Sequence, residues 1–305
     1  MLGGWLARLL PGSRELRDRA VAIIGAAEEP GIAITLAAAA EGARLALIET
    51  SPGQHNQLLE QAKHAGGTGI AAASLAEAAE TLRGLDIVIF TTGDPAPVSL
   101  RTLEAERFEA LLREQAVAAL AYVQEAVAVM EERGHGTIVA VVGGPGWSRS
   151  AGLGAHAAAQ AATLRTLDAL REEIAEVGIH LATVVPSGLA GWQPSAAQIA
   201  DGVTTVIRLQ LRALTLPPGA QAIEAMASLA PEPIGNLIAW FAGPPPPLIP
   251  EPRNRPSVRA EETETDVNGK VTANAAEPQS NNNAVRAAAA RAADLMDGLS
   301  RKRQP

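Results

Sequence analysis

Two glycines and a carboxylate, placed just after the first two apolar segments, could together hold a dinucleotide. The segment 20–25 ends at Gly25, and the turn then runs through Ala-Ala-Glu-Glu-Pro to Gly31. A glycine-containing turn lets the backbone approach a pyrophosphate, whose charge the N-terminus of the following helix attracts. Glu49 ends the second segment, where an acid accepts hydrogen bonds from the adenosine ribose and repels a 2′-phosphate. The pattern favours NAD over NADP, although tight strand–helix packing would explain both glycines equally well.

The elements that must position these residues alternate between buried strands and helices. Continuous apolar runs predict strands, and longer patterns between them predict helices. Such alternation indicates an α/β fold of the Rossmann type: a doubly wound parallel sheet with helices on both faces and ligands at the carboxyl ends of the strands. The expected strands are 20–25, 44–49, 69–73, 86–90, 137–142, 180–185 and a last one near 220–225, and the expected helices are 31–41, 52–65, 75–82, 103–133, 154–177 and 196–212.

Composition divides the chain into four parts. Residues 1–17 predict a short helix that packs on the domain or, with Trp5 and Leu9 on its apolar face, lies at a membrane surface. Residues 18–242 form the Rossmann-fold domain. The Pro/Asn-rich segment 243–283 is expected to be a disordered linker, because it has too little apolar surface to fold alone. Residues 284–305 predict a short helix with a basic end, which either docks on its own domain or binds a protein partner.

Charge and residue usage exclude several kinds of function. The net charge of −8 argues against nucleic acid as a partner. There is no cysteine, and the five histidines show no ligand spacing, so we expect no metal site. No apolar run is long enough to cross a membrane, and the N-terminus lacks the pattern of a signal peptide. The sequence therefore favours a cytoplasmic protein, with membrane contact limited to its first helix.

Several motifs in order resemble the short-chain dehydrogenase/reductase family over residues 18–230. Segment 24–43 resembles that family's opening T-G-x-x-x-G-x-G turn, with Gly25 and Gly31 as the first and third glycines and Glu29 in place of the middle one. Phe90-Thr91-Thr92-Gly93 stands at the N-N-A-G motif, and Val184-Val185-Pro186-Ser187-Gly188 resembles the P-G motif after the sixth strand. The resemblance implies an NAD(P)-binding oxidoreductase fold, with Gly25, Gly31, Glu49 and Gly93 at the cofactor.

The four side chains that carry the family's chemistry are all changed. The resemblance implies a Y-x-x-x-K pair, which here reads His156-Ala-Ala-Ala-Gln160, a serine at Gly143 and an asparagine at Gln115. A histidine can act as an acid near neutral pH, but Gln160 brings no charge and Gly143 no hydroxyl. Losing one polarising donor costs about 10²–10³ in rate. The only tyrosine, Tyr122, is expected to be a packing residue.

The sequence supports two functional hypotheses. The first is a pseudoenzyme retained for binding, assembly or NAD(H) sensing, because the glycine turn survives while the catalytic set does not. The second is an active NAD(P)-dependent oxidoreductase that uses His156 as the acid with Gln115 or Thr91 as helpers. Cofactor binding is a separate question, because Glu29 places a negative charge beside the expected pyrophosphate and would weaken or abolish NAD binding. The family resemblance implies a homodimer, or a heterodimer with an active paralogue, through the helices 103–133 and 154–177.

Overall fold

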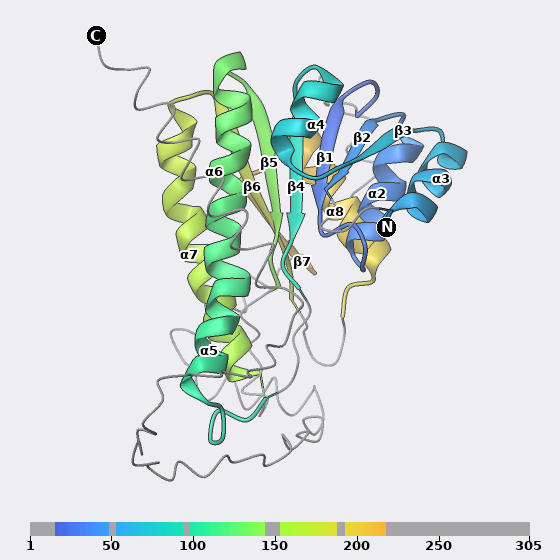
Figure 1. Ribbon diagram of the computed structural model, residues 1–305. Coiled ribbons are helices and arrows are strands. Elements are labelled where there is room, and N and C mark those ends of the chain that lie inside the picture. Colours follow the sequence, from blue (N-terminus) through green and yellow to red (C-terminus); the bar gives the residue numbers. More distant parts are fainter. Residues whose placement is uncertain (1–15, 49–52, 94–97, 144–152, 188–192, 218–305) are drawn as a thin grey trace, which may run out of the picture.

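The fold is a seven-stranded parallel sheet with the strand order β3-β2-β1-β4-β5-β6-β7 (Figure 1). The computed structural model describes residues 16–48, 53–93, 98–143, 153–187 and 193–217. The order reverses between β1 and β4, which pair with each other in parallel. This confirms the doubly wound Rossmann-type sheet. The strands are β1 (Ala20–Ile24), β2 (Arg44–Ile48), β3 (Thr68–Ala72), β4 (Ile87–Thr91), β5 (Gly136–Val141), β6 (Ile179–Pro186) and β7 (Ala213–Leu216).

Helices cover both faces of the sheet and bury two separate apolar clusters. One cluster joins the sheet to α2, α3 and α8, and the other joins it to α4, α6 and α7. In Figure 1, α6 and α7 stand side by side on one flank of the molecule. The helices are α2 (Gly31–Ala40), α3 (Asn56–Ala65), α4 (Leu75–Leu82), α5 (Ala105–Leu112), the π-helical turn η1 (Arg113–Val117), α6 (Ala118–Met130), the short 3-10 turn η2 (Glu131–Arg133), α7 (Gly154–Ala175) and α8 (Ala196–Leu209).

Small residues let these layers approach closely. Ala22 and Ala46 face each other across β1 and β2 and are fully buried. Ala38 and Ala39 of α2 are also buried against the sheet. In a chain with 3% aromatic residues, dense packing must come from alanine and branched aliphatic side chains, because voids in the core are costly.

The ends of several elements differ from the sequence prediction. Helix α3 begins at Asn56 rather than at residue 52. Helix α8 begins where expected, because Ser195 and Gln198 form a capping box, but it ends at Leu209 with Gln210 in the left-handed conformation. The prediction of helix to residue 212 was therefore wrong, and β7 follows at Ala213, a strand that was not predicted.

Other predictions concern segments outside the described residues. These are most of the expected N-terminal helix, the strand near 220–225, the linker 243–283 and the terminal helix 284–305. Of residues 1–17 the structure describes only Leu16 and Arg17, which precede β1, and Leu16 is buried.

The long helical region 103–133 is interrupted by a π-helical turn. Helix α5 ends at Leu112, η1 carries the chain to Val117, and α6 continues from Ala118. A π turn inserts an extra residue into the helix and is costly, so it is frequently found at functional positions. Hydrophobic periodicity did not predict the turn, and Gln115 lies within it.

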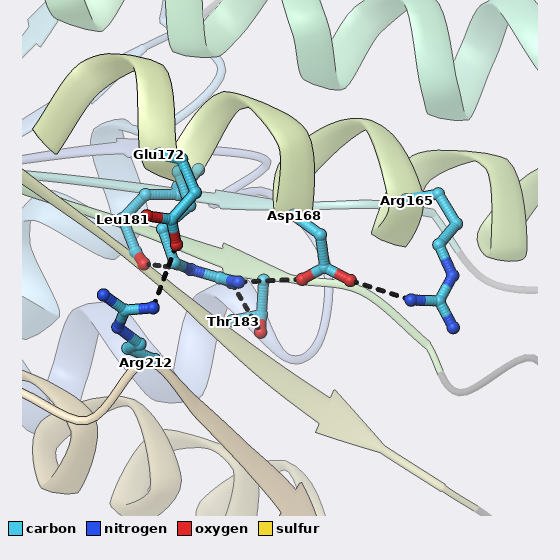
Figure 2. Close-up of polar contacts among 7 residues, drawn as sticks. Arg165, Asp168, Glu172, Leu181, Thr183 and Arg212 are labelled. Carbon is cyan, nitrogen blue, oxygen red and sulfur yellow. Dashed lines mark hydrogen bonds and ion pairs between the residues drawn. The ribbon is translucent and has the colours of Figure 1, made fainter.

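A polar cluster links α7 to strand β6 at the edge of the sheet, next to the point where pairing with β7 begins. Figure 2 shows residues of α7 reaching strand β6 and Arg212. The Arg171 guanidinium donates to the Leu181 carbonyl at 2.9 Å and to Asp168 at 2.7 Å. Pairing with β7 begins only at Thr183, so Arg171 covers a part of the β6 edge that has no strand beside it among the described residues.

Candidate functional site

The carboxyl ends of β1, β4 and β5 meet where the strand order reverses, which is where this fold class binds its ligands. Gly25 follows β1, Thr91 ends β4, and Gly143 lies just beyond β5. The Thr91 hydroxyl donates to the Gly25 carbonyl at 3.5 Å, so the ends of β1 and β4 are in direct contact. The parallel sheet thus brings residues far apart in the sequence to one edge.

Three of the four positions that correspond to the family's catalytic set form one buried cluster. Gln115 Nε2 lies 2.7 Å from His156 Nδ1, and Gln160 Nε2 lies 2.6 Å from His156 Nε2. Each of these three residues is only 4% exposed. The cluster joins the π turn η1 to the first turns of α7. The sequence identified these positions only by their correspondence to the family's motifs, and it did not predict that both glutamines would bind the same ring.

The histidine ring therefore has an amide partner at each nitrogen. A neutral imidazole donates at one nitrogen and accepts at the other, so one glutamine must present its oxygen and the other its NH₂. Gln115 Oε1 is buried and, within the described residues, has no hydrogen-bond partner. Rotating the Gln115 amide lets this oxygen accept from Nδ1–H while Gln160 donates to Nε2. In this arrangement both ring nitrogens are held by uncharged amides.

The Gln160 amide occupies the space that a side chain at position 143 would fill. A side-chain carbon added at Gly143 would collide with the Gln160 amide nitrogen. A serine at 143 would therefore have to displace the amide that holds His156. The absence of the hydroxyl and the presence of the glutamine are linked physically, and one cannot be reversed without disturbing the other.

The turn between β1 and α2 is tight for reasons internal to the protein. Gly25 has a φ of +83°, and a Cβ there would meet the Thr91 hydroxyl. A Cβ at Gly31 would meet the carbonyl of Gly25. Both glycines are thus required by the backbone itself. The Glu29 carboxylate accepts from the Ala33 amide at 3.3 Å, so it lies over the N-terminus of α2.

A carboxylate stands where this turn would receive a pyrophosphate. A phosphate group at the first helix would need the free amides and the positive end of the helix dipole, and here a carboxylate is bound to one of those amides. Gly93 is more open, since an added Cβ would have no atom within 4 Å among the described residues. Glu49, the expected ribose partner, lies outside the described residues.

Tyr122, as expected, is a packing residue. The centroid of its ring lies 5.6 Å from that of Phe90. Phe90 is fully buried in the apolar cluster that includes α6. Burial raises the pKa of the Tyr122 phenol, and the neighbouring Glu125 carboxylate raises it further. A phenol with a raised pKa is a poorer proton donor than an ordinary tyrosine.

The described residues contain neither a candidate metal site nor a candidate membrane-spanning helix. Within those ranges, no group of three or more His, Asp or Glu side chains could hold a metal ion. None of the helices in the described part of the chain is long and apolar enough to cross a membrane.

Comparison with known proteins identifies the family. The sequence profile of the short chain dehydrogenase family matches residues 19–192. The chain therefore belongs to the short-chain dehydrogenase family. No sequence among curated proteins matches it.

Solved structures share the fold at low sequence identity. A short-chain type dehydrogenase/reductase from Mycobacterium marinum has a TM-score of 0.61 and 16% identity, and the match covers 67% of this chain and 96% of that one. A short-chain dehydrogenase from Rhodopseudomonas palustris has a TM-score of 0.56 and 20% identity, with 66% and 99% covered. An NADH-dependent reductase, A1-R′, complexed with NAD, has a TM-score of 0.58 and 18% identity, with 67% and 97% covered.

Sequence reasoning missed two features of the site. It identified Gln115 as a changed position but did not place it in a π turn. It left open where Glu29 points, although Glu29 stands four residues before Ala33, a spacing at which an acid can reach back to the first turn of a helix. The acidic pair Glu28-Glu29 just before Pro30 was the available signal.

Proposed function

We propose that this protein is a catalytically degenerate member of its family, a pseudoenzyme that acts by binding or assembly. The observation that carries the proposal is the pairing of both His156 ring nitrogens with Gln115 and Gln160 inside a buried cluster. A general acid must present a proton within hydrogen-bond reach of the substrate oxygen. A ring held between two amides has no nitrogen left for that oxygen unless one amide withdraws.

The electrostatics of the cluster support the same proposal. A tyrosine acid in this family depends on a nearby ammonium to lower its pKa, and Gln160 supplies no charge. Gly143 supplies no donor to polarise a carbonyl, and the Gln160 amide takes the space that a serine side chain would need. Oxyanion donors and a tuned acid together account for several orders of magnitude in rate.

The alternative is an active oxidoreductase with His156 as the acid. It is favoured by one observation, namely that Gln115, His156 and Gln160 do meet at the carboxyl end of the sheet. Under this alternative, Gln160 would release Nε2 when a substrate oxygen arrives. The two proposals differ in a measurable quantity, the rate of hydride transfer, and in its dependence on His156.

The test is turnover by the full chain with NADH and NADPH across a broad panel of carbonyl compounds, and with NAD and alcohols in reverse. We expect rates at background for the wild-type protein and for His156→Ala. Turnover that disappears in His156→Ala but survives in Gln160→Ala would overturn the proposal. His135→Ala serves as the matched control, because His135 is an exposed histidine away from the cluster.

We also propose that the protein assembles through the flank formed by η1, α6 and α7. Val117 of η1 is 45% exposed and is one of the exposed large hydrophobic residues in the described chain. On α7, Ala158 is exposed and Ala161 is partly exposed, so a second helix could approach closely. An exposed apolar residue on η1 and accessible small residues on α7 suit a homodimer or a heterodimer with a family paralogue.

Light scattering coupled to gel filtration of the full chain tests this assembly. We expect a dimer, and we expect Val117→Asp and Ala158→Arg each to shift it toward monomer. Ala65→Arg is the control, because Ala65 is an exposed alanine of α3, which packs on the opposite face of the sheet from α6 and α7. A protein that is monomeric at high concentration, or a dimer that neither variant weakens, would contradict the proposal.

A further inference from the structure

The first turn of α2 is already supplied with acceptors from its own chain. The Ile32 amide donates to the Glu28 carbonyl at 3.1 Å, and the Ile34 amide donates to the Pro30 carbonyl at 3.0 Å. Between them, the Ala33 amide donates to the Glu29 carboxylate at 3.3 Å. Two of the amides that normally remain unpaired at a helix N-terminus, those of Ile32 and Ala33, are therefore bound internally.

The two glycines of this turn do not require a ligand to explain them. Gly31 packs against the backbone of Gly25, and Gly25 packs against Thr91 at the end of β4. The glycines thus close the turn on itself and onto the neighbouring strand. The two glycines are therefore explained by packing within the protein. Their presence alone does not indicate that the turn binds a pyrophosphate.

We propose that Glu29 acts as an internal anion that closes the nucleotide-binding turn, so that the chain excludes NAD and NADP. The carboxylate lies at the positive end of the α2 dipole, which is the position that attracts the pyrophosphate in this fold class. A dinucleotide would have to displace this carboxylate and then remain beside its negative charge. No lysine or arginine occurs between residues 20 and 43 to offset that charge.

The size of the effect follows from the charges and their exposure. Glu29 is exposed, so solvent screens its repulsion of a phosphate, but the two anions compete for the same helix end. We expect a penalty of about tenfold to a thousandfold in dinucleotide affinity. The inference does not depend on the proposed loss of catalysis, because binding and turnover are measured separately.

The experiment is a titration of the full-length protein with NADH, followed by the fluorescence anisotropy of the cofactor and by calorimetry. Glu29→Ala removes both the charge and the acceptor, and Glu29→Gln removes the charge while keeping an acceptor. Glu28→Ala is the matched control, because it makes the same change in net charge at the adjacent exposed position. Adenosine, which carries no phosphate, is titrated in parallel.

We expect no saturation of the wild-type protein up to about 1 mM NADH. Glu29→Ala should gain at least tenfold in affinity over Glu28→Ala, Glu29→Gln should lie between them, and adenosine binding should not change. Micromolar binding of NADH to the wild-type protein would overturn the proposal, and so would a Glu29→Ala variant no better than Glu28→Ala. If Glu29→Ala fails to fold, the Glu29→Gln comparison decides in the same way.

Discussion

Replacing His156 with alanine should destabilise the fold through the two glutamines that it holds. Gln115 and Gln160 are each buried to the same degree as the ring, and each loses its partner in the variant. A buried polar group left unpaired costs about 1–3 kcal/mol. Because one amide can turn toward other groups, the two costs do not add fully, and we expect a loss of about 2–5 kcal/mol in the free energy of unfolding.

Urea denaturation monitored by circular dichroism measures this loss. The variant should show a lower midpoint at an unchanged slope, which indicates lower stability rather than a changed denatured state. In thermal melts, the same loss corresponds to a decrease of about 4–20 °C for a domain of this size. The control is His135→Ala, whose side chain is exposed and which should remain within about 0.5 kcal/mol of the wild-type protein.

An equal result for the two variants would refute the reasoning. If His156→Ala unfolds at the same urea concentration as His135→Ala, then the ring is not a structural bridge between η1 and α7. A ring that is free of its glutamines could turn toward a substrate, which would favour the active oxidoreductase over the pseudoenzyme.

Three further outcomes follow from the described contacts. Gly143→Ser should lower the free energy of unfolding by about 1–3 kcal/mol, because the serine displaces the amide of Gln160. The same substitution should cost less in a Gln160→Ala background, which a double-mutant cycle followed by urea denaturation would measure. Arg171→Ala should cost about 1–3 kcal/mol by removing the donor that the Leu181 carbonyl binds. Arg165→Ala, whose side chain is 87% exposed, should cost less than about 1 kcal/mol in the same assay. The pKa of Tyr122 is raised in the folded protein, so its stabilising contribution is fully present below the unfolded phenol pKa of about 10 and is lost as pH rises above it; tyrosinate absorbance should therefore appear only above pH 10 in the native state.

Most of the fold followed from local patterns. The continuous apolar runs of β1, β2 and β5 predicted strands buried on both faces, and the structure confirms them within one residue at each end. The regular alternation with helices was sufficient for a parallel sheet, because parallel strands need a crossover between them. Ends were harder to predict: β7 has only four residues, and its position depends on pairing with β6 rather than on its own sequence.

The candidate site divides in a similar way. Residue types alone showed that Gln115, Gly143, His156 and Gln160 depart from the family set, since a missing hydroxyl or ammonium is visible in the sequence. The direction of a side chain is not visible there. Only the packing of α7 against η1 decided that both glutamines bind one imidazole, and only the first turn of α2 decided that Glu29 reaches back to Ala33.

The sequence by itself determined the class of fold, the residue types at positions 115, 143, 156 and 160, and the presence of an acid in the glycine turn. These properties depend on periodicity and on chemical identity, which are local. The tertiary structure decided how these residues are arranged, namely as a buried His–Gln cluster and a carboxylate at the N-terminus of α2. Both depend on distances between groups that belong to different elements or different turns, and such distances are set only when the chain has folded.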